Sequence, residues 1–533
     1  MAASQKLLYS SVVVIIIGVF TKLWLFGAIV RFGIKDQVSL KKSNEVRAVY
    51  LKLPFPLNFK LYFFNVTNPQ EIQNGEKPIV NEVGPYWYDE FKEKVDVVDN
   101  ETEDSLTYTP YDLYQFNQNK SGSLRDDDYI TIIHPVIVGM VNIVMKNSPV
   151  FLSIVNQSLE AIFNNPKTIF FTGRVKDLLF DGIDLNCTSS GFAPKAICSQ
   201  LKTQIPGIKY RQDNENIYLF SMLGPRNASH NKRLKVLRGI SYSKELGRLI
   251  EVDGEKEVSF WSTSKCNSFD GTDGWIFPPL LAADEGLKSY STDLCRNMKV
   301  NYVNDTVYKK IHVRYYETNL GDQSTNAEEK CYCPSEDICL KKGVFDMTKC
   351  MGVPLYATLP HFLYTDESYI EQLTGLRPDP SKHSLGVLFE PMTGTPLFAA
   401  KRMQFNYDLN PTTKVALFSK LPSLLFPIFW LEESIDLEGD LLKKLQTIFL
   451  LLFLADIFLY LLILFGVCCL AMAIYFRFKN RNAIAITSVT EARSYENPGF
   501  LNNDMKRSNK KAGFTEKMEN INHALTGHEF DRY

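Results

Sequence analysis

The sequence predicts an α+β protein in which one large domain of antiparallel strands and helices lies between two membrane-spanning helices. Three observations lead to this prediction. Long apolar runs lie near both ends of the chain, and the segment between them holds an even number of cysteines and many Asn-x-Ser/Thr sequons. Within that segment, short strand-like stretches are separated by proline and glycine throughout.

The two apolar runs extend from Leu7 to about Val30 and from about Ile448 to Phe476. A helix needs about 20 apolar residues to cross a bilayer, and neither run has a polar face. A cleaved signal peptide has an apolar core of only about 7 to 15 residues, so the first run indicates an uncleaved anchor. We therefore expect a cytoplasmic N-terminus (1–6), a first span (7–30), an ectodomain (31–447), a second span (448–476) and a cytoplasmic tail (477–533).

The composition of the segment between the spans favours an extracellular location. It holds seven sequons, whereas the tail after Arg477 has eight asparagines and no sequon. Eight of the ten cysteines lie in the same segment, as an oxidising compartment would favour. We predict N-glycosylation at the seven sequon asparagines, which are Asn65, Asn100, Asn119, Asn156, Asn186, Asn227 and Asn304.

Local patterns within the ectodomain indicate mixed strand and helix. Alternation and β-branched or aromatic residues predict strands at 60–67, 233–240 and 309–318. At 150–163 the apolar residues share one helical face, and 173–182 is a second helical candidate. Because no internal repeat is visible, we expect a single sizeable domain of short antiparallel strands rather than βαβ units.

The sequence carries no pattern typical of an enzyme or a nucleic-acid-binding protein. The net charge of -1 gives no electrostatic signature for nucleic acid. No nucleophile elbow, zincin motif, phosphate-binding loop or dinucleotide fingerprint occurs, and the histidines lack metal-ligand spacing. We therefore predict no catalytic residue, no metal and no cofactor, with a dispersed ecto-enzyme site as the alternative.

The stretch "KCYCPSEDICLKKGVFDMTKC" (330–350) holds four cysteines at close spacing. A zinc site would favour a reducing compartment and a C-x2-4-C pair, and C-x-C chelates poorly. In a glycosylated ectodomain the same cysteines favour disulfides. The spacing alone leaves open how these four pair with each other and with Cys266 and Cys295.

Each apolar run contains one charged residue deep within it. Counting about 1.5 Å per helical residue, Lys22 and Asp456 lie at a similar depth in the outer leaflet. Our hypothesis is that they form an ion pair that holds the two spans together. The alternative is that each side chain reaches separately to the membrane interface.

Several motifs occur together and in a consistent order along the ectodomain. They are "VNEVGPYWYDEF" (80–91), "CNSFDGTDGWIFPPL" (266–280), "STDLCRN" (291–297), "GVFDMTKC" (343–350), "LPHFLY" (359–364), "FEPMTGTPLFAAKRMQFN" (389–406) and "PIFWLEES" (427–434). Together they resemble the class B scavenger receptor and fatty acid translocase family over nearly the whole ectodomain. Within it, "NFKLYFFNVTNPQEI" (58–72) and "LNCTSSGFAPKAIC" (185–198) are most similar to the insect sensory neuron membrane proteins.

The resemblance implies a fold and a set of disulfides. The fold is an antiparallel β-barrel-like core with an apical helical bundle at about 136–183 and an internal lipid tunnel. The implied disulfides are Cys266–Cys331, Cys295–Cys350 and Cys333–Cys339, with Cys187–Cys198 as a fourth.

The resemblance also implies that ligands are captured at the apex. Lys167 corresponds to a family apex lysine, whereas Asn165 stands where another lysine is expected. We take Lys167, Arg174 and Lys176 as candidates for contact with acidic head groups, the alternative being that they are merely solvated.

The function implied is that of a non-enzymatic lipid receptor in the plasma membrane of a sensory dendrite. It would take up hydrophobic odorants or lipid-derived pheromones, including fatty acid derivatives, and pass them through the tunnel to the membrane. Expected partners are an odorant receptor complex and odorant-binding proteins. The alternatives are a scavenger receptor for lipoprotein, fatty acid or carotenoid uptake and an adhesion or phagocytic receptor.

Overall fold

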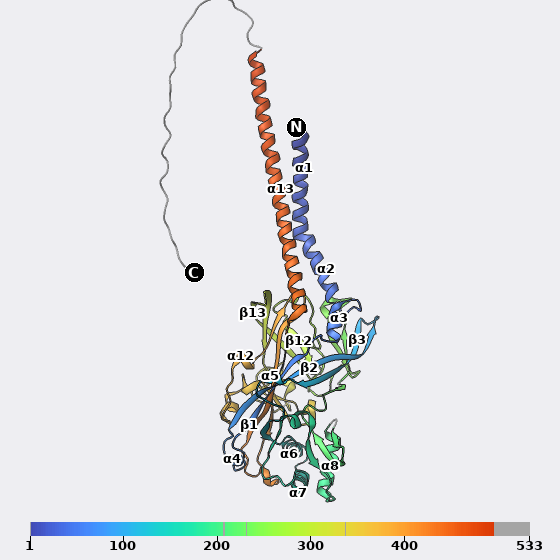
Figure 1. Cartoon of the computed structure of the whole chain (residues 1–533), viewed down its shortest axis with the longest axis vertical. Coiled ribbons are helices and arrows are strands. Elements are labelled where there is room, and N and C mark those ends of the chain that lie inside the picture. The colour runs from blue at the N-terminus through green and yellow to red at the C-terminus, as the bar shows by residue number, and fades with distance from the viewer. Residues whose placement is uncertain (1, 206–207, 231, 336, 495–533) are drawn as a thin grey trace, which may run out of the picture. The chain divides into compact units, whose positions relative to one another are not determined.

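The computed structural model describes residues 2–205, 208–230, 232–335 and 337–494 (Figure 1). The predicted tail therefore lies outside the described residues from position 495 on. The chain divides into two units, one formed by the terminal segments up to Val19 and from Leu461, the other by Phe20–Tyr460.

Helices occupy both predicted membrane segments. The first consists of α1 (Ala2–Phe20), a π-helical turn η1 (Thr21–Leu25) and α2 (Phe26–Val38), and the second is α13 (Gly439–Ser494). Within the described residues, Gln5–Val38 and Gly439–Asn482 are long and apolar enough to span a membrane. Both helices continue beyond the predicted apolar runs, and the positions at which they enter and leave the bilayer stay a prediction.

Glycines allow close contact between the helices of the terminal unit. A Cβ at Gly18 would lie 2.8 Å from Ile463 Cγ1, and a Cβ at Gly466 would lie 2.8 Å from Ile15 Cγ1. Bilayer lipid offers no hydrophobic driving force for helix association, so membrane helices depend on close packing. Small residues at such positions allow that packing.

The larger unit is built on one antiparallel sheet in the order β11-β10-β3-β2-β1-β19-β18-β17-β14-β13-β12. These strands are β1 (Leu57–Val66), β2 (Val80–Asn100), β3 (Ser105–Phe116), β10 (Leu234–Leu237), β11 (Leu249–Val252), β12 (Leu287–Ser291), β13 (Arg296–Tyr308), β14 (Ile311–Thr318), β17 (Leu385–Glu390), β18 (Thr395–Leu409) and β19 (Leu424–Asp436). Three short strands extend it, namely β9 (Ser229–His230) beside β3, β16 (Tyr356–Thr358) beside β18, and β15 (Phe345–Asp346) beside β16.

The two edges of this sheet meet at a single short segment. The Leu249 amide of β11 donates to the Gly271 carbonyl, and the Thr272 amide donates to the Lys288 carbonyl of β12. Gly271 has φ +100°, and a Cβ there would lie 2.4 Å from the Lys288 carbonyl, so glycine is required at this contact. The sheet is thereby nearly closed, which confirms the predicted α+β class and barrel-like core.

A helical cap lies at the end of this unit opposite α2 (Figure 1). It comprises α6 (Pro135–Asn147), η2 (Pro149–Phe151), α7 (Leu152–Ile162), a π-helical turn η3 (Asp177–Asp181) and α8 (Phe192–Gln204). The cap extends beyond the predicted bundle at about 136–183, because it also includes α8, which lies later in the sequence. Two small sheets accompany it, formed by β4 (Tyr129–Ile133) with β5 (Phe170–Arg174), and by β6 (Ile183–Asn186), β8 (Asn214–Phe220) and β7 (Lys209–Arg211).

Short helices complete the connections between the strands. They are α3 (Glu45–Leu51), α4 (Pro69–Gln73), α5 (Gln118–Ser121), η4 (Ser243–Glu245), α9 (Ser264–Asn267), η5 (Lys330–Tyr332), α10 (Thr348–Met351), η6 (Pro360–Phe362), α11 (Glu367–Glu371), α12 (Pro380–His383) and η7 (Ala416–Phe418).

Alternation along β2 determines what faces the interior of the barrel. Tyr86, Tyr88 and Glu90 are buried, whereas Phe91 is exposed on the outer face. Because strand side chains alternate between faces, Lys92 continues the inward series. The inward face of β2 thus changes from aromatic to charged along the strand.

Candidate ligand site in the barrel interior

Four aromatic side chains surround the interior where the helical cap meets the barrel, and we refer to them as the aromatic collar. The Phe59 and Tyr114 rings lie 4.9 Å apart, and Phe180 of the cap lies 5.1 Å from Tyr88 and 5.7 Å from Tyr114. Phe59, Tyr88 and Tyr114 belong to the largest hydrophobic core, and the partly buried Phe180 packs against it. The collar therefore links the cap to the barrel interior by an apolar surface.

Seven charged side chains follow the collar on the inward face, and we refer to them as the luminal charge cluster. They come from six segments of the chain and are Glu90, Lys92, Asp112, Arg226, Asp293, Lys401 and Glu433. Strand register explains how they meet, because Lys92 is paired with Asp112 across β2 and β3, and Lys401 with Glu433 across β18 and β19.

Two ion-pair groups make up the luminal charge cluster. Lys92 Nζ lies 3.0 Å from Glu90, 3.2 Å from Glu433 and 3.7 Å from Asp112. Asp293 lies 2.5 Å from Lys401 and 3.0 Å from Arg226. Asp293 comes from the β12–β13 turn, and Arg226 comes from the segment after β8. The cluster therefore joins segments that are far apart along the chain.

Burial changes the protonation of this cluster. Burial raises the pKa of Glu90 to about 7, and the neighbouring Glu433 adds to the effect while Lys92 opposes it. Burial acts in the same direction on Asp293, but Arg226 and Lys401 outweigh it and hold the pKa of that carboxyl well below its usual range. At neutral pH the cluster therefore contains a partly protonated Glu90 and an ionised Asp293.

A buried lysine continues the inward series beyond the cluster. Lys94 Nζ donates to the Tyr50 carbonyl at 2.7 Å and lies over the rings of Tyr50, at 3.9 Å, and Trp275, at 4.7 Å. Burial lowers the pKa of Lys94 to about 8, although the negative charge of Asp273 opposes this shift. The interior is thus polar along three successive inward-facing positions of β2, namely Glu90, Lys92 and Lys94.

The three apex cations named from the sequence differ in their partners. Arg174 makes two hydrogen bonds of 2.8 Å to Asp177, and Lys176 lies 2.6 Å from Asp127. Lys167 is exposed and donates to Asn165 at 3.3 Å, with no ion pair to any carboxylate among the described residues. Arg174 and Lys176 thus meet at Asp127, which lies 3.6 Å from Arg174, whereas Lys167 shares no carboxylate with them among the described residues, and contact of the three cations with acidic head groups stays a prediction.

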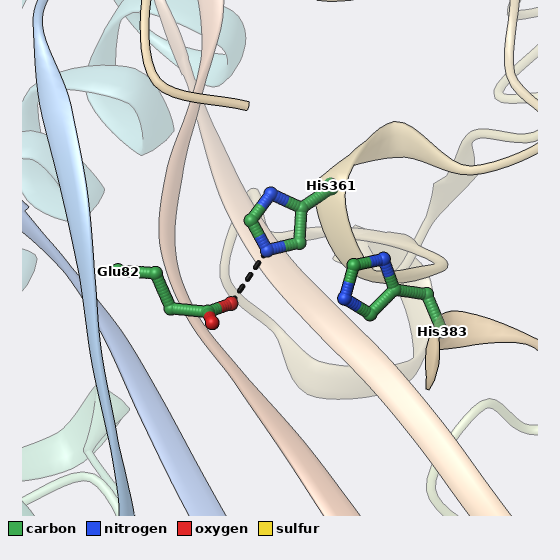
Figure 2. Close-up of side chains that lie close together, drawn as sticks. All are labelled: Glu82, His361 and His383. Atoms are coloured by element: carbon green, nitrogen blue, oxygen red, sulfur yellow. Dashed lines mark hydrogen bonds and ion pairs between the residues drawn. The ribbon is translucent and has the colours of Figure 1, made fainter. Parts of the chain in front are cut away.

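Glu82, His361 and His383 lie together on the outer face of the barrel (Figure 2). Glu82 Oε2 accepts hydrogen bonds from His361 Nε2 at 2.5 Å and from Trp430 Nε1 at 2.6 Å. The histidine rings stack with centroids 4.4 Å apart. Local sequence patterns do not reveal this cluster, because Glu82 lies far along the chain from the two histidines.

The tautomers of both histidines argue against a metal ion in this cluster. The backbone amides of Arg377 and Asp379 donate to Nδ1 of His361 and His383, each at 3.0 Å. A neutral imidazole that accepts at Nδ1 carries its proton on Nε2, which leaves no lone pair there for a metal. The cluster instead fixes the segment around η6 and α12 to the barrel through Glu82.

A comparison with known families decides the identity of this fold. The CD36 family description matches residues 9–477, which include both apolar helices, the barrel and the cap. The chain belongs to the CD36 family.

Relatives within the CD36 family agree with this assignment. The chain is 40% identical to "Sensory neuron membrane protein 1" of Apis mellifera over 474 residues, which are 88% of this chain and 91% of the relative. It is also 40% identical to the proteins of the same name from Ostrinia furnacalis, with 79% of this chain and 80% of the relative covered, and Antheraea polyphemus, with 81% and 82% covered.

Disulfides join the segments that flank the CD36-family barrel. Eight of the described cysteines form Cys187–Cys198, Cys266–Cys331, Cys295–Cys350 and Cys333–Cys339, which are the pairs that the resemblance implied. Beside Cys266 lies a cleft of about 880 Å³, whose mainly polar lining includes Arg248, Lys265, Arg296, Glu329 and Lys342. Such a lining suits polar groups better than an alkyl chain.

The sequon asparagines differ in exposure. Asn100, Asn119 and Asn304 are exposed. Three others are half-buried, and their Oδ1 atoms accept hydrogen bonds from backbone amides far along the chain. The pairs are Asn65 with Thr131, Asn156 with Ala416, and Asn227 with Tyr114. Asn186 is half-buried and accepts from the nearby Thr188 amide.

Proposed function

We propose that this chain is a non-enzymatic receptor that captures hydrophobic odorants or lipid-derived pheromones at the surface of sensory neurons and delivers them to the membrane. The observation that carries the proposal is the 40% identity, over 88% of the chain, to a relative named as a sensory neuron membrane protein. The barrel domain would lie outside the cell, with both termini in the cytoplasm and an odorant receptor complex and odorant-binding proteins as partners.

The proposed route begins at the helical cap. Lys167 is the best candidate for first contact with a polar head group, because Arg174 and Lys176 are already neutralised by carboxylates. From the cap, the aromatic collar offers an apolar path into the barrel. Burying about 14 methylenes is worth roughly 11 kcal/mol, so a path that keeps an alkyl chain out of water removes most of the barrier to delivery.

Binding of a fluorescent fatty acyl ester to the full-length protein in detergent tests this proposal. We expect saturable binding that excess unlabelled ester abolishes. Absence of saturable binding would contradict lipid delivery and would favour a receptor for adhesion or phagocytosis.

Tissue distribution tests the sensory part of the proposal. We expect the transcript mainly in antennal sensory tissue. A transcript found mainly in gut or haemocytes would contradict the sensory role and favour a scavenger receptor for lipoprotein, fatty acid or carotenoid uptake.

A further inference from the structure

The luminal charge cluster retains accessible surface although its residues point into the barrel. The side chains of Arg226, Lys401 and Asp293 are 42%, 36% and 27% exposed. In a filled barrel, inward-facing side chains pack against one another and expose little surface. Space therefore remains beside these three side chains, and a ligand group that enters it meets a guanidinium and an ammonium group.

Arg226 and Lys401 have hydrogen-bond donors to spare. Among the described residues, both form their ion pairs with the same carboxylate, Asp293. A guanidinium and an ammonium group together carry more N–H donors than one carboxylate can accept in good geometry. The remaining donors suit an oxygen acceptor on a ligand.

The charges of the cluster leave no place for an additional anion. Its three cations already face four carboxylates, so the cations are fully compensated even when Glu90 is protonated. A ligand carboxylate here would be an uncompensated charge away from bulk water, which is strongly disfavoured. A carbonyl, ester or hydroxyl oxygen accepts the same hydrogen bonds without adding charge.

Glu90 supplies an independent observation that points to a ligand. It is 1% exposed and its side chain aims into the interior, yet neither carboxyl oxygen has a hydrogen-bond partner among the described residues. Lys92 Nζ lies 3.0 Å from Oε1 but outside hydrogen-bonding geometry. Buried polar groups are almost always hydrogen-bonded, so the unpartnered Glu90 carboxyl indicates a missing hydrogen-bond partner.

We propose that the luminal charge cluster binds the oxygen-bearing end of a neutral long-chain amphiphile, such as an ester, aldehyde or alcohol, and discriminates against carboxylates. The alkyl chain extends towards the aromatic collar, which begins one inward-facing position along β2 from Glu90. This inference rests on the proposed function, because it requires a lipid ligand to enter the barrel.

Photolabelling of the full-length protein in lipid nanodiscs tests the inference. The probes are hexadecyl acetate with a diazirine beside the ester, hexadecyl acetate with a diazirine at the far end of the chain, and hexadecanoic acid with a diazirine beside the carboxylate. We expect the first probe to label peptides that contain residues 90–94, 226 or 401, and the second to label peptides of the collar. The acid should label the cluster at least about tenfold less than the first probe.

The outcomes separate this inference from the proposed function. Labelling of the collar but not the cluster by both esters, or equal labelling of the cluster by acid and ester, overturns the inference and leaves lipid entry intact. If neither ester labels any inward-facing residue, both the inference and the proposed function are overturned.

Two neighbouring variants test where the selectivity arises. Glu433→Gln removes one negative charge from the cluster, so the acid-to-ester labelling ratio should rise severalfold. Glu432→Gln is the matched control, because Glu432 is the adjacent residue on the opposite face, where it pairs with Lys60 and Arg402. An equal acid-to-ester labelling ratio in both variants overturns the proposed selectivity. If Glu433→Gln does not fold, the sites that the three probes label in the wild type test the inference instead.

Discussion

Lys22 of the first helix and Asp456 of the last form an ion pair within the segments predicted to span the membrane. Lys22 Nζ also lies 4.4 Å from the ring centroid of Tyr460. Lys22 belongs to the π-helical turn Thr21–Leu25, and such turns are frequent at functional positions in helices. The pairing matches the hypothesis drawn from helical depth, in which the two charges hold the spans together.

Exchange of these two charges should restore what either single reversal removes. Lys22→Asp and Asp456→Lys each place two like charges together in a low-dielectric environment, so each should reduce delivery to the cell surface. The double variant should recover delivery, measured by surface biotinylation. Lys35→Asp, at an exposed position of α2, should have little effect. Failure of the double variant to recover would show that the pair does not hold the spans together.

His134 should make the protein less stable as the pH falls. Burial lowers the pKa of His134 to about 3, and its ring packs between Phe163 and Phe171. The unfolded chain, with an ordinary histidine pKa near 6.5, therefore binds more protons than the folded chain between about pH 6.5 and 3. The free energy of unfolding should fall through this window as acid is added.

His134→Asn should reduce this acid sensitivity, because asparagine can still cap α6 but does not titrate. Thermal unfolding from pH 7.5 to 4.5 measures the effect, with His312→Asn, at an exposed position, as the control. An unchanged pH dependence in His134→Asn would contradict the assignment.

Zinc should not stabilise the cluster of Glu82, His361 and His383. Both Nδ1 atoms accept backbone amide hydrogens, so metal binding at Nε2 would require a ring to abandon that hydrogen bond or lose a second proton. We expect no rise in Tm on addition of excess Zn²⁺. A rise that disappears in His383→Ala would show that the rings reorient and bind metal.

Removal of the Glu82 carboxylate should destabilise the fold. Burial raises the pKa of Glu82, but hydrogen bonds from His361 and Trp430 outweigh this effect and bring the pKa below its ordinary value. The ionised form is therefore stabilised in the folded state. Its contribution is fully present above the ordinary carboxyl pKa and is lost as the pH falls through the lowered one. Glu82→Gln should cost about 1–3 kcal/mol at pH 7, measured by thermal unfolding, with Glu76→Gln, at an exposed position, as the control.

Exposure should decide which sequons carry glycans. We expect Asn100, Asn119 and Asn304 to be occupied in protein from insect cells, since their side chains are exposed. Asn227 should remain unmodified, because its amide lies against the β3 backbone. Enzymatic deglycosylation in heavy-oxygen water followed by peptide mass spectrometry measures the occupancy of each site, and a glycan at Asn227 would contradict this order.

Periodicity predicted the local elements well where a single face is buried. The strand predicted at 60–67 corresponds to β1, and the helix predicted at 150–163 corresponds to η2 and α7. The helix predicted at 173–182 is wrong in its first part, because β5 continues to Arg174 and only the later residues form η3. Pairing of β5 with β4 overrides the local helical pattern there.

The candidate site could not be predicted from local patterns. The luminal charge cluster joins residues separated by more than three hundred positions, and its members look like ordinary surface charges in sequence. They face inward only because the sheet closes through Gly271 and Thr272. The lipid tunnel and the role of Lys167 remain predictions, since they depend on a ligand as well as on the fold.

Transfer of a fluorescent fatty acyl ester from water into proteoliposomes measures directly whether ligands reach the membrane through the barrel interior. Ala399 faces inward, two residues before Lys401 on β18, so Ala399→Trp should narrow the path, whereas Phe91→Trp changes only the exposed outer face. We predict that the wild type and Phe91→Trp accelerate transfer over protein-free liposomes and that Ala399→Trp slows it. Equal rates for Ala399→Trp and the wild type, or no acceleration by the wild type, would show that ligands do not pass through the barrel interior.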